Sequence, residues 1–168
     1  MNLEFSLNGK PASLEIEPRE TLAEVLRLRC RLTGVKVSCD AQVCGSCTVL
    51  VDALPVSSCT YLAYEVRDKQ VVTIEGLAGE SGRLHPLQQA FIDQFAFQCG
   101  FCTPGMILAA KAFLDERLSA ASSAPPEITG AEIVAHMNGN LCRCTGYLPI
   151  LKAIRQAAAH MRADREKA

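Results

Sequence analysis

QCGFCTPG (residues 98–105) and LCRCTG (residues 141–146) are the two stretches that decide how this chain folds. Each places two cysteines in a short loop, and a threonine follows the second cysteine. Pro104 and Pro149 come shortly afterwards, and proline is favoured in the first turn of a helix. The pattern predicts two similar units, each made of a helix, a cysteine loop and a second helix.

Two such units can form a four-helix bundle that has both cysteine loops at one end. Cys99, Cys102, Cys142 and Cys144 would then meet in one site. Four thiols without a histidine suggest iron and sulfide, or zinc, and this spacing alone suits zinc almost as well as iron. Both loops lead into predicted helix N-termini, whose amides and dipole stabilise thiolates and a negative cluster. Arg143, between two of the cysteines, would add positive charge near a cluster; the competing interpretation is a solvated or docking side chain.

A second set of four cysteines lies upstream, with the spacing C-x4-C-x2-C-x11-C, at Cys39, Cys44, Cys47 and Cys59. The first three match the plant-type spacing for a 2Fe-2S cluster. The Gly45–Ser46 dipeptide between them is small and lets the backbone approach a cluster closely. A zinc ribbon is the competing interpretation, although zinc sites of four cysteines usually contain two C-x2-C pairs.

The composition excludes several function classes. The chain has 168 residues, of which 49% are hydrophobic and 21% charged, so it can bury a core. Its net charge is −1, and no basic face typical of nucleic-acid binding stands out. We find no apolar run long enough to span a membrane and no signal-peptide pattern at the N-terminus. Nine cysteines without an export signal argue against a disulfide scaffold, so we expect a cytoplasmic protein whose thiols bind metal.

The first half of the chain predicts a sheet with one helix. Asn8-Gly9 is a strong hairpin signal between two segments of alternating polarity. Thr21 and Glu24 form a capping box at the start of a helix that Gly34 ends. Further strands are expected at residues 48–51, from residue 56, and at 70–74. Two hairpins around one helix make a β-grasp arrangement, as in plant-type ferredoxins.

The second half predicts helices only. We expect them at residues 86–97, at 104–118 with Thr103 as N-cap, at 130–137 with Thr129 as N-cap, and at 149–162. Residues 119–127 are a linker of small residues and proline, and the last six residues are charged. The expected fold class is α+β, with a β-grasp domain over 1–75, a connecting segment over 76–84 and a helical domain over 85–168.

The order of these motifs carries a family resemblance. A plant-type loop, then QCGFCTPGM, then NGNLCRCTGY resembles the iron–sulfur subunit of the xanthine oxidase family of molybdenum hydroxylases. The resemblance covers nearly the whole chain. The loop CDAQVCGSCTV is most similar to bacterial members with separate subunits, such as carbon monoxide, nicotine and caffeine dehydrogenases.

The resemblance implies roles for particular residues. One 2Fe-2S cluster, near the molybdenum cofactor, would be held by Cys99, Cys102, Cys142 and Cys144. The other, nearer FAD, would be held by Cys39, Cys44, Cys47 and Cys59. Gln98 matches a glutamine that lies beside molybdopterin in the family, and its amide can both donate and accept hydrogen bonds.

The chain also departs from the family pattern. Many members have Gly-Cys-Gly at the first ligand, where this chain has Ser38, Cys39 and Asp40, and glycine is usual at the position of Ala53. Cys30 falls where the family has a core leucine, and we interpret it as a buried apolar thiol.

The remaining aromatic and titratable residues give weaker signals. We interpret the four phenylalanines at 91, 95, 97 and 101 as bundle packing. The three histidines, at 85, 136 and 160, are scattered, and capping, core or surface roles suit them better than metal binding.

The resulting hypothesis is an electron-transfer subunit of a molybdenum hydroxylase, without a catalytic acid, base or nucleophile of its own. Electrons would pass from molybdopterin on a large partner subunit, through two 2Fe-2S clusters, to FAD on a medium subunit, in a heterotrimer or a dimer of heterotrimers. A free-standing two-cluster ferredoxin-like carrier and a zinc-stabilised interaction module are the alternatives.

Overall fold

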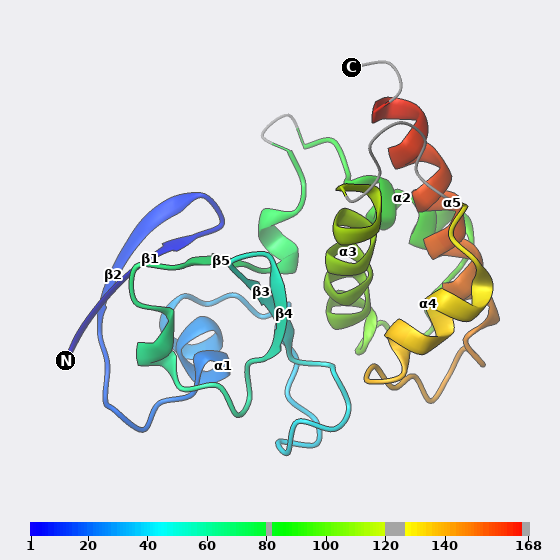
Figure 1. Ribbon diagram of the computed structural model, residues 1–168. Coiled ribbons are helices and arrows are strands. Elements are labelled where there is room, and N and C mark those ends of the chain that lie inside the picture. The colour runs from blue at the N-terminus through cyan, green and yellow to red at the C-terminus, as the bar shows by residue number, and fades with distance from the viewer. Residues whose placement is uncertain (80–81, 120–126, 166–168) are drawn as a thin grey trace.

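The structure is a computed structural model that describes residues 1–79, 82–119 and 127–165. These residues form two halves, one built around a sheet and one built of helices, which lie side by side (Figure 1). The predicted α+β class is therefore confirmed. Part of the predicted linkers (residues 80–81 and 120–126) and the last three residues of the charged end lie outside the described residues.

The first half contains a five-stranded mixed sheet with the strand order β2-β1-β5-β3-β4. β1 pairs with β2 in an antiparallel hairpin and with β5 in parallel, while β3 pairs antiparallel with both β4 and β5. The strands are β1 (Asn2–Leu7), β2 (Lys10–Glu15), β3 (Thr48–Val51), β4 (Leu54–Ser57) and β5 (Gln70–Val72). This is the predicted β-grasp arrangement, although β4 begins two residues before the predicted start.

The helix of the β-grasp half starts at the predicted capping box. The Thr21 side chain accepts a hydrogen bond from Glu24 N, and the Glu24 carboxylate accepts one from Thr21 N at 2.8 Å. The helix α1 (Leu22–Glu24) continues as a wider, π-helical turn, η1 (Val25–Arg29). It therefore ends before Gly34, where the sequence predicted its end. Two short 3-10 turns, η2 (Ala63–Val66) and η3 (Ile74–Gly76), flank β5.

The second half contains four helices among the described residues: α2 (Pro86–Asp93), α3 (Thr103–Ser119), α4 (Gly130–Met137) and α5 (Leu148–Arg165). His85 caps α2 by accepting a hydrogen bond from Leu87 N at 3.2 Å, and Thr129 caps α4 as predicted. Large apolar side chains from all four helices share one buried core, with Phe91, Leu114, Ile133 and Ile154 among its members.

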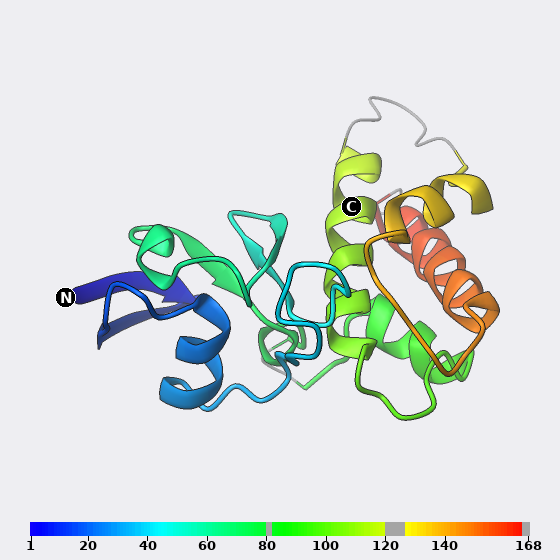
Figure 2. The ribbon, with the colours of Figure 1, turned by 90° about the horizontal axis from the view of Figure 1, so that it is seen from below.

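α3 joins the two halves. Its residues Leu108 and Ala112 form a small buried cluster with Leu50 of β3, and Val72 of β5 packs against this cluster. In Figure 2, α3 is the helix nearest the sheet half, and the chain around residue 45 also runs close to its first turn. The first turn of α3, which directly follows Cys102, is therefore packed against the cysteine loop before β3.

Two helix boundaries differ from the predictions. α2 ends at Asp93 and not near residue 97, because Phe95 adopts a left-handed conformation with φ of 50°. Phe95 was predicted to pack in the bundle, but its exposed fraction is 82%. Thr103 was predicted as an N-cap, but it is the first residue of α3, and its buried Oγ1 has no hydrogen-bond partner among the described residues.

The turn between β3 and β4 suggests a stabilising substitution. Asp52 and Ala53 have φ values of 48° and 68°, in the left-handed region that favours glycine. Ala53 is exposed, so its side chain contributes little packing. We expect Ala53→Gly to raise the free energy of unfolding by about 1 kcal/mol, as measured by denaturant titration. Ala131→Gly, at an exposed position of α4, is the control and should lower it by about 1 kcal/mol. A loss of stability in Ala53→Gly would contradict the turn geometry.

Candidate metal centre

One pocket of about 400 Å³ at one end of the helical half is lined by four cysteines from two loops of that half, and Cys44 of the upstream set also lines it. Cys99 and Cys102 lie between α2 and α3, whereas Cys142 and Cys144 lie between α4 and α5. The structure thus brings together the two loops that the internal repeat predicted to meet. We call this group of four thiols the helical site.

The thiols of the helical site lie in pairs. The Cys144 thiol donates to Cys99 Sγ at 3.6 Å. Burial, together with the neighbouring Cys142 thiol, raises the pKa of the Cys102 thiol to about 12. One pair therefore combines Cys99 with Cys144, and the other combines Cys102 with Cys142, so each pair contains one residue from each loop.

Cys142 has the surroundings of a thiolate. Burial opposes its ionisation, but hydrogen bonds from Thr145 and from the Cys144 amide outweigh burial and lower the pKa of Cys142. Thr145 contributes its hydroxyl at 3.2 Å and its amide at 3.5 Å. Tyr147 supports the same loop, because its hydroxyl oxygen accepts a hydrogen bond from Cys142 N at 2.9 Å. Nothing in the sequence singled out Tyr147 beyond its place at the end of the motif NGNLCRCTGY.

The upstream cysteines are set in the loop before β3 and at the end of β4. Cys39 Sγ accepts hydrogen bonds from the amides of Val43 and Cys44, both at 3.4 Å. Together with the Ala41 amide, these donors lower the pKa of Cys39 to about 7. Amides directed at sulfur stabilise negative charge, as an iron–sulfur cluster requires. We call Cys39, Cys44, Cys47 and Cys59 the β-grasp site.

The other two thiols of the β-grasp site are buried against the sheet core. Burial raises the pKa of Cys47 to about 11, and the Cys59 thiol beside it contributes. Ser58, which is fully buried, donates its hydroxyl to Cys47 O at 2.6 Å and so fixes the return strand next to the loop. The β-grasp site therefore also divides into two pairs, Cys39 with Cys44 and Cys47 with Cys59.

The arrangement of the thiols in two pairs per site fits a binuclear cluster. Each iron of a 2Fe-2S cluster with four cysteine ligands takes two thiolates, and both sites offer two pairs. In residues 1–79, 82–119 and 127–165, no group of three or more His, Cys, Asp or Glu side chains is arranged to hold a single ion. All nine cysteines are free thiols. The buried Thr103 hydroxyl, which follows Cys102, has no hydrogen-bond partner within the described part of the chain, so it is free to donate to a sulfur of a bound cluster.

The other residues singled out by the sequence lie on the surface near the helical site or away from it. Gln98 is exposed next to Cys99, and Arg143 is exposed and lines the pocket. Of the four phenylalanines, only Phe91 is buried, so the bundle-packing interpretation is wrong for Phe95, Phe97 and Phe101. His85 caps a helix, His136 stacks on Phe113 with ring centroids 4.7 Å apart, and His160 is exposed.

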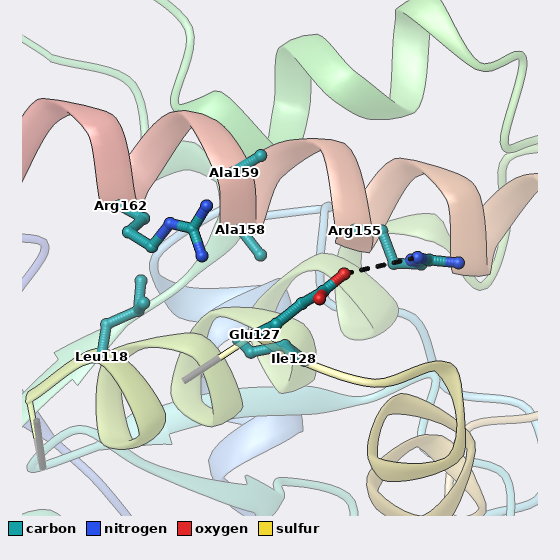
Figure 3. A pocket seen from close by; sticks show the side chains of 7 residues that line it. All are labelled: Leu118, Glu127, Ile128, Arg155, Ala158, Ala159 and Arg162. Carbon is teal, nitrogen blue, oxygen red and sulfur yellow. Dashed lines mark ion pairs between the residues drawn. The ribbon is translucent and has the colours of Figure 1, made fainter. Parts of the chain in front are cut away.

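A second pocket lies at the opposite end of α3. Figure 3 shows Glu127 between α3 and α5, directed toward Arg155, with their charged groups 4.0 Å apart. Leu118, Ile128 and Arg162 complete its walls with two alanines of α5. No cysteine lines this pocket, so it is separate from both thiol sites.

Two positions at which the chain departs from the family pattern, Asp40 and Ala53, have unusual backbone conformations. Asp40 has φ of 51° and Ala53 has φ of 68°, so both stand where glycine would be unstrained. Aspartate tolerates this region better than most residues. The substitution at residue 40 therefore leaves the loop conformation in place, and it adds a carboxylate beside Cys39.

Two domain families match the chain. A 2Fe-2S iron–sulfur cluster binding domain matches residues 5–78, and a 2Fe-2S binding domain matches residues 73–155. The chain is therefore a two-domain 2Fe-2S protein. In the described part of the chain, no helix is both long and apolar enough to cross a membrane.

Similar proteins narrow this class. The chain is 43% identical to the nicotinate dehydrogenase small FeS subunit of Eubacterium barkeri, over 94% of each protein. The structure of quinoline 2-oxidoreductase from Pseudomonas putida 86 matches with a TM-score of 0.87 and 42% identity, over all of this chain and 98% of that one. The aldehyde oxidoreductase of Desulfovibrio desulfuricans also matches at 0.87, with 39% identity over 97% of this chain and 17% of the longer one.

The chain belongs to the iron–sulfur subunits of the xanthine oxidase family of molybdenum hydroxylases. Membership makes it an electron-transfer component of an oxidoreductase complex. It also decides between iron and zinc, which the cysteine spacing of the helical site had left open.

Proposed function

We propose that this chain carries electrons between a large molybdopterin-binding subunit and a medium FAD-binding subunit of a molybdenum hydroxylase. The supporting observation is that eight cysteines form two sites, each divided into two pairs of thiols. The helical site and the β-grasp site would each hold one 2Fe-2S cluster. Such clusters supply one-electron transfer when bound, between a two-electron oxidation and a flavin.

The surface around the helical site supports a docking role toward the large subunit. Phe101 and Leu141 line its pocket and are exposed, and Phe97 is exposed one residue before Gln98. Clustered exposed apolar side chains are typical of surfaces that a partner covers. We propose that Gln98 contacts molybdopterin from this surface through its amide.

The remaining details of the assembly are part of the same proposal. The helical site would face molybdenum and the β-grasp site would face FAD, in a heterotrimer or a dimer of heterotrimers. The domain boundary would fall in residues 76–84, between a β-grasp domain and a helical domain. We place the complex in the cytoplasm, because free thiols persist where the environment is reducing.

Iron analysis and electron paramagnetic resonance (EPR) of the purified complex test the proposal. Two 2Fe-2S clusters predict about four irons for each copy of this chain, a reddish-brown colour and two distinct EPR signals after reduction. Fewer than about four irons per chain, or a single type of EPR signal, would contradict the proposal of two clusters. In gel filtration the chain should elute with larger subunits, whereas elution at the size of one 168-residue chain would favour a free carrier.

Tyr147 provides a prediction about the helical site alone. We expect Tyr147→Phe to lower the free energy of unfolding by about 1 kcal/mol, because the Cys142 amide loses its acceptor. The EPR signal and midpoint potential of the helical site should shift, with unchanged iron content. Redox titration followed by EPR measures both signals in the same sample.

Tyr64→Phe is the matched control, since Tyr64 is exposed in the β-grasp half. This variant should leave both potentials unchanged. If Tyr147→Phe shifted only the β-grasp signal, the assignment of the two signals to the two sites would be reversed.

A further inference from the structure

The two cysteine sites meet through main-chain contacts. Leu141 N donates a hydrogen bond to Cys44 O at 2.9 Å. The Asn140 side-chain amide donates to Gly45 O at 3.1 Å. Both acceptors lie in the cysteine loop of the β-grasp site, and both donors lie in the turn before Cys142. We call these contacts, together with Gly105, the loop junction.

Two glycines let the backbones approach closely at the loop junction. Gly45 has φ of 67°, and a Cβ atom on it would lie 2.5 Å from Asn140 Nδ2 and 2.5 Å from Gly139 O. A Cβ atom on Gly105, in the first turn of α3, would overlap Gly45 O. Glycine is needed where backbones approach this closely. Three segments that are distant in the sequence are therefore packed main chain against main chain.

Asn140 is the only side chain that donates to this junction from the helical half, among the hydrogen bonds of the described residues. It is 7% exposed. Gly45 O also accepts from the Thr48 hydroxyl at 2.8 Å and from Thr48 N at 3.2 Å, so the acceptor is fixed from the sheet side. Because a buried amide must keep its hydrogen bond, the bond from Asn140 to Gly45 O fixes the position of the helical half relative to the β-grasp half.

The junction also connects the two sites directly. Cys44 belongs to the β-grasp site, and its carbonyl accepts the Leu141 amide, which directly precedes Cys142 of the helical site. One hydrogen bond and a few covalent bonds therefore separate two cysteines of different sites. The rate of electron transfer falls steeply with distance. A small change in the distance between the two sites therefore changes the electronic coupling between them.

We propose that Asn140 is a positioning residue that fixes the spacing of the two cysteine sites and thereby the electronic coupling between the centres they hold. Asn140 contributes no thiol to either site, so this role differs from ligation. The inference rests on the proposed function, in which each site holds a 2Fe-2S cluster.

EPR of the reduced, assembled complex tests this role, because two reduced centres at fixed spacing interact magnetically. We expect Asn140→Ala to keep full iron content and both signals but to change the magnetic splitting between them. Transfer between the centres should slow by about tenfold, since small misplacements of reacting groups can have effects of this size. Asn140→Ser keeps a short polar group at the same position and should show the same change to a smaller extent.

Asn138→Ala is the matched control, because Asn138 is exposed in the same turn. It should leave the splitting unchanged. Unchanged splitting in both Asn140 variants at full iron content would overturn the proposal. Loss of iron from either site in both variants would also overturn it, because Asn140 would then be needed for the site itself. Failure of the proposed function is visible separately, since the unaltered complex would lack one of the two signals.

Discussion

Replacing Cys142 with serine should remove about half of the iron, from about four to about two atoms per chain, since each 2Fe-2S cluster contains two. Hydrogen bonds from Thr145 and from the Cys144 amide to its sulfur lower the pKa of the Cys142 thiol. Serine offers a hard oxygen that binds iron–sulfur clusters poorly compared with a soft thiolate. One EPR signal should disappear while the β-grasp signal survives.

The functional result of Cys142→Ser follows from the proposed order of the sites. A compound that bleaches the unaltered complex should no longer reduce the flavin in the variant, which stopped-flow absorbance measures. If the flavin were still reduced at the normal rate, the helical site would not lie between molybdenum and FAD. Loss of all four irons would instead show that the two sites form only together.

Cys30→Ser is the matched control for Cys142→Ser. Cys30 is half-buried against the core of the β-grasp half, and burial raises the pKa of its thiol. It pairs with no other cysteine among the hydrogen bonds of the described residues. We therefore expect full iron content and a small loss of stability.

Local signals in the sequence predicted local structure well. The Asn8-Gly9 turn has φ values of 51° and 77°, as a tight hairpin requires. The capping boxes at Thr21 and Thr129 start helices where expected. Each of these signals depends on residues that are close in the sequence, so tertiary contacts did not change the outcome.

Predictions that depended on the surroundings of a residue failed more often. Helical periodicity placed Phe95 on the apolar face of α2, but the helix had already ended and Phe95 is exposed. Periodicity does not distinguish a core from a surface that another subunit covers. Thr103 had the sequence features of an N-cap, but its hydroxyl is buried without a partner next to Cys102. Neither outcome could be read from neighbours in the sequence.

The loop junction is a further feature that local sequence signals did not predict. Gly45 was predicted only to let the backbone approach a cluster, and Gly105 and Asn140 received no role. Their contacts join the β-grasp loop, α3 and the turn after α4, and Asn140 and Gly45 are 95 residues apart. Such a meeting of main chains depends on how the two halves pack, which no motif within either half records.

Gly105→Ala should therefore have a large effect on stability. An added Cβ atom would overlap Gly45 O and approach Ser46 O to 3.1 Å, and main-chain atoms cannot rotate aside. We expect a loss of about 2–3 kcal/mol, as for overpacked cores, and a fall of about 5–10 °C in the unfolding midpoint. Thermal unfolding of the iron-loaded protein measures it. The contact of α3 with Leu50 would weaken at the same time, because the clash pushes the first turn of α3 from the sheet.

Gly130→Ala separates this clash from the general effect of adding a methyl group to a helix start. Gly130 begins α4, and a Cβ atom on it would meet nothing within 4 Å. Alanine also favours a helix over glycine by about 1 kcal/mol, so this variant should be neutral or more stable. Equal stability of Gly105→Ala and Gly130→Ala would mean that α3 does not approach the cysteine loop as closely as described. A loss confined to Gly105→Ala means that the close approach of α3 to the cysteine loop contributes to the packing of the two halves.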